Sequence, residues 1–137
     1  MTPLRRAPDG GEGSGDADYV FACRFSLAPD EGLRAEPAEF ETTLYRPADP
    51  PGADGWLFFR DNCWRGAFND PAHVRRLTED ALGVPVLSVD FRELRTDEAY
   101  LDALNDEIRA NLGLFNADSA SEVLHKYLGS SVHVREP

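Results

Sequence analysis

The chain has almost no lysine. Lys126 is the sole lysine in 137 residues, whereas arginine occurs 13 times and Asp and Glu together occur 25 times, which gives a net charge of −11. Such a surface repels itself at ordinary ionic strength, but molar salt shortens the Debye length to about 3 Å and screens the repulsion. A GC-rich genome would explain arginine in place of lysine but not the excess of acids. We therefore expect a halophilic protein of a salt-rich cytosol.

Cysteines and long apolar runs are scarce too. Cys23 and Cys63 stand alone, which is neither a zinc-ligand spacing nor a disulfide framework, so we expect reduced thiols in the cytoplasm. No run approaches the roughly 18 apolar residues that indicate a transmembrane helix, so we expect no membrane insertion. Arg5 and Arg6 are not followed by an apolar segment, which argues against an export signal.

The length predicts one domain, and 42% hydrophobic residues are enough for a core. Residues 1–17 are rich in glycine and acids and predict a disordered tail. We expect residues 18–134 to form a single domain.

The first half of that domain is typical of strands. Large apolar side chains alternate from Tyr19 to Leu27, which predicts a strand with Cys23 on its core face. After a loop over 28–38, residues 40–46 are β-branched and aromatic and predict a second strand.

Residues 56–68 form the segment richest in aromatic residues, preceded by a turn region over 47–55. A turn at Asp61 and Asn62, which tolerate left-handed backbone, would make this segment a hairpin. A single long strand is the other interpretation, and the sequence does not separate the two.

The second half predicts helices around one strand. Asp70 and Pro71 are typical of a helix start, and Gly83 of its end. Alternation at Leu87, Val89 and Phe91 then predicts a strand facing the core with these three residues.

Two further helices and a short strand complete the domain. Thr96 is positioned to cap a helix with apolar residues at 101, 104, 108, 112 and 115. Ser119 and Glu122 form a capping box for a last helix, ended by Gly129 and followed by a closing strand over 132–134. This order predicts an α+β fold: a mostly antiparallel sheet of four or five strands, with about three helices on one face.

No metal or cofactor site follows from the sequence. Glu98, Asp102 and Asp106 form a row of carboxylates along one helix face, but a straight row does not converge on an ion. The three histidines have no metal-ligand spacing. A nucleophilic Cys63 with a histidine base lacks the glycine elbow or positive helix end that would support it.

Arginines recur on the predicted strands around one tryptophan. If Arg24, Arg60, Arg65 and Arg92 converge beside Trp64, they form a cationic patch that could bind a carboxylate or phosphate by bidentate contacts. Alternatively, each arginine pairs with a neighbouring acid. We treat these five residues as candidates for binding a ligand or partner.

Three segments, Trp56–Gly66, Ser88–Tyr100 and Leu124–Ser131, together resemble the LWR-salt protein family, small proteins of halophilic archaea named for a Leu-Trp-Arg motif. The resemblance covers residues 18–134, with Cys63 in the place of the motif's leucine before Trp64 and Arg65. It implies a haloarchaeal source and a function that is not established for the family. It supplies no catalytic residues.

No reaction follows from these observations, and we favour a non-enzymatic binding or assembly module. It would bind a protein partner or self-associate through a sheet edge or the last helix. The alternative is a regulatory or enzymatic domain that binds a small anion or phosphate around Arg60, Trp64 and Arg65. Nucleic-acid binding is disfavoured because the chain is acidic and molar salt removes the counterion-release contribution.

Overall fold

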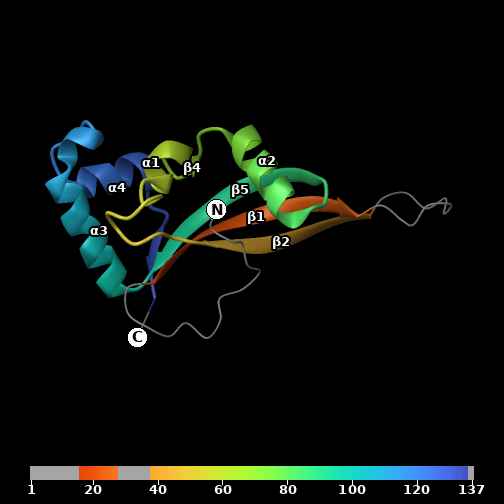
Figure 1. Cartoon of the computed structure of the whole chain (residues 1–137), viewed down its shortest axis with the longest axis horizontal. Helices are drawn as coiled ribbons and strands as arrows, with labels where there is room; N and C mark the ends of the chain where they lie inside the picture. Colours follow the sequence, from red (N-terminus) through yellow and green to blue (C-terminus); the bar gives the residue numbers. More distant parts are fainter. Residues whose placement is uncertain (1–15, 28–37, 136–137) are drawn as a thin grey trace.

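A computed structural model of the chain describes residues 16–27 and 38–135 (Figure 1). Most of the tail expected over residues 1–17 and of the loop expected over 28–38 lies outside these ranges. Asp16 and Ala17, which we assigned to the tail, belong to the fold. Ala17 begins the first strand, and the Asp16 amide donates to the Asp97 carboxylate at 3.0 Å.

A four-stranded sheet runs through the molecule in the order β2-β1-β5-β6. The central strand β1 (Ala17–Leu27) pairs antiparallel with β2 (Ala38–Pro47) and with β5 (Val86–Thr96). The closing strand β6 (Val132–Val134) adds in parallel to β5. The expected mostly antiparallel sheet is therefore confirmed, with one short parallel pair at its edge.

The helices and the sheet form an α+β fold, as expected. The helical segments are α1 (Phe58–Asn62), α2 (Pro71–Leu82), α3 (Glu98–Ala110), the 3-10 turn η1 (Leu112–Leu114) and α4 (Ala120–Leu128). Figure 1 shows α1, α2 and α4 on the same side of the sheet, with α3 along one end of it. The opposite side of the sheet carries no helix among the described residues.

Two of the predicted helix caps are present. The Asp70 carboxylate accepts from the His73 amide at the start of α2, and Gly83 ends that helix with a left-handed φ of 73°. The Ser119 hydroxyl accepts from the Glu122 amide at the start of α4.

The cap of α3 differs from our expectation. Asp97 caps this helix, since its carboxylate accepts from the Tyr100 amide at 2.7 Å. Thr96 is instead the buried last residue of β5, with its hydroxyl donating to the Asp97 carbonyl. Both Thr and Asp are residue types that cap helices. Thr96 is paired with Ala17 in the sheet, so the next residue, Asp97, takes the capping position.

Leu87 does not face the core, contrary to the alternation we inferred. Arg24 of β1 pairs with Ser88, and the next residue, Phe25, pairs with Val86. Two residues of β5 therefore oppose one step of β1, which is a β-bulge. The bulge turns Leu87 outward, where it is 44% exposed, and buries Val86.

The segment 56–68 matches neither of our two interpretations. It forms the short helix α1 and then a small hairpin of β3 (Cys63–Trp64) and β4 (Ala67–Phe68). The hairpin turns at Arg65 and Gly66, while Asp61 and Asn62 belong to α1.

Burial of two adjacent phenylalanines explains the helix. Successive residues of a strand point to opposite faces, so a strand would bury only one of them against the sheet. In α1 both are buried: Phe58 packs on Tyr19 of β1, with ring centroids 4.6 Å apart, and Phe59 stacks on Phe115 at 5.8 Å. Tertiary packing thus outweighs the strand propensity of this segment.

Candidate functional site

The structure separates most of the candidate arginines. Arg24 forms an ion pair with Glu39 of the neighbouring strand at 2.6 Å, and Arg60 forms one with its neighbour Asp61 at 2.8 Å. Arg92 lies exposed on β5, and no ion pair involves it within the described part of the chain. Of the four arginines, only Arg65 lies against Trp64.

Trp64 and Arg65 stand at the tip of the β3–β4 hairpin. Trp64 pairs with Ala67, so the loop consists of two residues, Arg65 and Gly66. Both have positive φ, 53° and 85°, which is the backbone of a type I′ turn. Arginine rarely adopts this left-handed conformation, whereas glycine and asparagine adopt it readily.

The turn also caps α4. The Arg65 amide donates to the Lys126 carbonyl at 2.9 Å, and the Gly66 amide donates to the Tyr127 carbonyl at 3.1 Å. Carbonyls in the last turn of a helix have no partner within the helix, so these bonds satisfy them. Gly129 permits this approach, because a Cβ there would lie 3.2 Å from the Arg65 carbonyl carbon.

An aromatic chain links this tip to the core. Trp64 is 43% exposed and meets Tyr127 edge to face, with ring centroids 5.8 Å apart. Tyr127 in turn contacts the rings of Phe59 and Phe115. The Arg65 guanidinium lies 5.6 Å from the centre of the Trp64 ring, within the range of a cation–π contact. We call Trp64, Arg65 and Tyr127 the hairpin surface.

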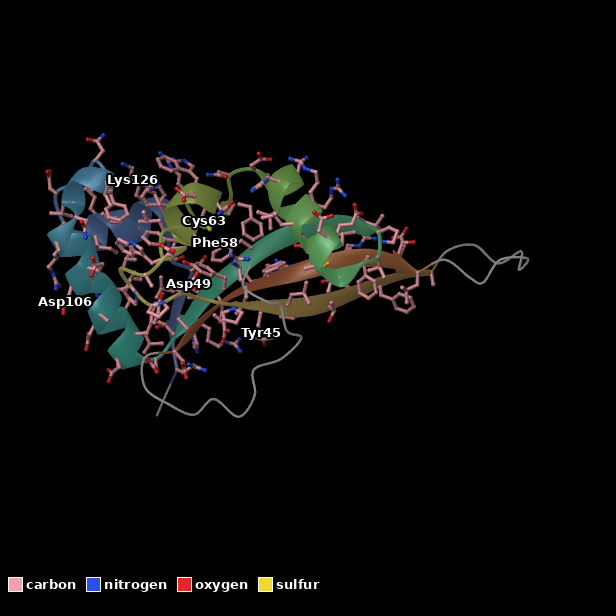
Figure 2. All side chains as sticks on the ribbon, in the orientation of Figure 1. Tyr45, Asp49, Phe58, Cys63, Asp106 and Lys126 are labelled. Carbon is pink, nitrogen blue, oxygen red and sulfur yellow. The ribbon has the colours of Figure 1, made fainter. Side chains whose placement is uncertain are left out.

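The sole lysine, labelled in Figure 2, is the residue before Tyr127 in α4. Lys126 Nζ donates to the Phe115 carbonyl at 2.9 Å and to the Asn116 carbonyl at 3.3 Å. Asn116 is left-handed, with a φ of 51°. A compact ammonium has three rotatable donors, which suits two adjacent carbonyls better than a planar guanidinium does. No sequence signal distinguished this role of Lys126.

Cys63 is buried and chemically quiet. Its side chain has no exposed surface, and burial raises the pKa of the thiol to about 12. The thiol is therefore protonated at neutral pH and is a poor nucleophile. Cys23 is also a buried free cysteine, and burial raises its pKa in the same way.

A pocket of about 410 Å³ lies beside α1. It is lined by Arg46, residues 52–58, Asp61 and Asn62. None of the five candidate residues from the sequence lines it. Sequence reasoning missed Arg46. The strand register pairs it with Tyr19 and thereby places its side chain on the core side of β2, and the sequence alone does not give this register.

The described residues show neither a metal-ligand cluster nor a helix that could span a membrane. Residues 16–27 and 38–135 contain no cluster of three or more His, Cys, Asp or Glu that could hold a metal ion. In this part of the chain no helix is long and apolar enough to cross a membrane.

The fold and the hairpin define a small acidic α+β protein that exposes a tryptophan and an arginine on a tightly fixed turn. Residues 15–137 match the family described as LWR-salt protein, so the chain belongs to that family. No curated protein and no solved structure matched the chain. The resemblance noted in the sequence is thereby confirmed, and its motif residues 63–65 form β3 and the first position of the turn.

Proposed function

We propose that this protein is a non-enzymatic binding module that contacts a protein partner through the hairpin surface. The observation that carries the proposal is the presence of Arg65 at a left-handed position of a two-residue turn. Asn-Gly or Asp-Gly would satisfy this turn better than Arg-Gly. The chain thus gives up local stability where a guanidinium is presented beside an exposed indole, and such conflicts concentrate at functional sites.

The residue types of the hairpin surface support a protein partner. Tryptophan, tyrosine and arginine dominate the energetics of protein interfaces, because they combine large apolar area with directed hydrogen bonds. Trp64 can bury its exposed edge in a partner's apolar pocket, while Arg65 pairs with a carboxylate at the rim. The hydrogen bonds to α4 hold the tip in place before binding, which lowers the entropic cost of association.

The setting we propose is a salt-rich cytoplasm. The support is the net charge of −11 and the two buried free cysteines, which suit a reducing compartment. At molar salt the attraction between exposed charges is screened, so burial of Trp64 would contribute more to affinity than the Arg65 ion pair.

The test uses tagged protein and four chains: wild type, Trp64→Ala, Arg65→Asn and a control, Leu114→Ala. Leu114 is a 47% exposed leucine outside the hairpin surface. Each chain is incubated with extract of the source organism in molar KCl, and the retained proteins are quantified. We expect a protein that wild type and Leu114→Ala retain and the two hairpin variants lose. Identical retained sets for all four chains would contradict the proposal.

Self-association is the other form of a binding module. The edge strand β2 pairs only with β1 in the sheet of the described residues, so it could accept a second copy. Sedimentation of the full chain in molar KCl tests this form. A strictly monomeric protein would exclude self-association. A dimer that persists in Arg65→Asn would show that the interface between the two copies does not depend on the hairpin surface.

A further inference from the structure

The pocket beside α1 contains a half-buried arginine held against an aromatic ring. Arg46 projects from the end of β2, and its guanidinium lies 4.4 Å from the centre of the Phe58 ring. Phe58 packs in turn on Tyr19, with the two rings tilted by 49°. A cation–π contact uses the charge of the guanidinium and none of its N–H donors, so these donors can still bind a planar acceptor.

Among the residues that the structure describes, no carboxylate forms an ion pair with Arg46. Five other arginines form ion pairs with carboxylates: Arg24, Arg60, Arg75, Arg95 and Arg109. Within residues 16–27 and 38–135, no carboxylate lies at ion-pair distance from the Arg46 guanidinium, and no hydrogen bond involves this side chain. Burial lowers the pKa of its guanidinium, partly opposed by the charge of Asp49. A partly desolvated cation that is offset only by a carboxylate beyond ion-pair distance would be stabilised by an anion bound directly to it.

The pocket also contains negative charge. Asp54 and Asp61 both line it. The Asp61 carboxylate is already held by Arg60 at 2.8 Å, while Asp54 is exposed and has no ion pair or hydrogen bond among the described side chains. Trp56, Leu57 and Phe58 supply the apolar part of the pocket wall. A phosphate dianion would be repelled by these aspartates, whereas a ligand that carries both charges would not.

We propose that this pocket binds a small zwitterion of the amino-acid type. The ligand carboxylate accepts two N–H bonds from Arg46, the ammonium group faces Asp54, and the side chain rests on the apolar wall. A volume of about 410 Å³ is sufficient for such a molecule. The site is separate from the hairpin surface, so failure of either proposal leaves the other standing.

The test is a two-dimensional NMR titration of the ¹⁵N-labelled chain in molar KCl with four probes. L-alanine carries both charges, propionate and ethylammonium carry one each, and inorganic phosphate represents a dianion. We expect saturable shifts of the amides of residues 52–58 with L-alanine, and at least about tenfold weaker binding of the three other probes, since each loses one charge-assisted contact or meets repulsion. Tighter binding of propionate or phosphate than of L-alanine would overturn the zwitterion assignment.

Variants locate the site. Arg46→Met and Asp54→Asn should each weaken L-alanine binding by about tenfold or more, and Arg46→Lys should bind with intermediate affinity. Arg24→Met is the matched control, because Arg24 lies on β1 and pairs with Glu39. Asp54 is exposed, so its variant tests the site even if a change at Arg46 perturbs folding. Unchanged affinity in both Arg46→Lys and Asp54→Asn, or no saturable shift with L-alanine, would refute the proposal.

Discussion

Replacement of the sole lysine, Lys126, tests how much its two hydrogen bonds contribute to the stability of the fold. In Lys126→Met the aliphatic chain is kept, but the Phe115 and Asn116 carbonyls lose the donors at 2.9 and 3.3 Å. A hydrogen bond to a charged group contributes about 1.5–3 kcal/mol. Lys126 is only half-buried, so water replaces part of this contribution, and the freed side chain regains entropy. We therefore expect Lys126→Met to lower the free energy of unfolding by about 1–2 kcal/mol.

Urea denaturation in molar KCl measures this change, and thermal unfolding should show a loss of about 3–10 °C in Tm. The control is Arg109→Met, which removes an ion pair to Asp106 whose side chains are 61% and 76% exposed. That pair should contribute at most about 0.5 kcal/mol, and less in molar salt. Denaturation curves that coincide for wild type and Lys126→Met would refute the role of this ammonium.

Three further predictions concern stability and reactivity. Gly129→Ala should lose about 1–3 kcal/mol of unfolding free energy, because the new Cβ would lie 3.2 Å from the Arg65 backbone and Gly129 itself has a positive φ. Gly113→Ala is the control and should change stability little, because the space around Gly113 is open. Equal losses in the two variants would refute the close approach of Gly129 to Arg65. The Cys63 thiol, with its pKa raised to about 12, should not react with a thiol reagent at pH 8 until the chain is unfolded. The thiol of the unfolded chain ionises at a lower pH than the buried thiol does, so the free energy of unfolding should also fall as the pH rises from about 9 to 12. The melting temperature should rise from dilute buffer to molar KCl, because salt screens the repulsion between the acids. The rise should be smaller in Asp102→Asn, which interrupts the row of carboxylates on α3. Equal melting temperatures of the wild type in the two media would contradict the expectation of a salt-stabilised fold.

Local signals in the sequence predicted much of the fold. Alternation located β1, β-branched and aromatic content located β2, and the caps at Asp70 and Ser119 located α2 and α4. Each of these signals depends only on residues that are close together in the sequence, so it can be read without the fold. The outward position of Leu87 depends on a register shift between β1 and β5, which only the paired strands determine.

The candidate site was predicted in part. Trp64 and Arg65 are adjacent in sequence, so their proximity was certain, but their exposure depends on the turn at Arg65 and Gly66. Arg24 and Arg60 have acids of their own, which the sequence could offer only as an alternative. Arg46 was missed because its place over the Phe58 ring depends on the register of β2 with β1 and on the helical conformation of residues 58–62, which no local pattern shows.

Arg65→Asn tests the central claim most directly, since it creates the Asn-Gly pair that a type I′ turn prefers while it removes the guanidinium. Unfolding free energy and partner retention are measured on the same preparation in molar KCl. We predict a variant at least as stable as wild type that retains a tenth or less of the partner, on the order of 1.4 kcal/mol of lost binding energy. A variant that is less stable, or that retains the partner fully, would show that Arg65 serves the fold and would contradict the hairpin surface as the binding site.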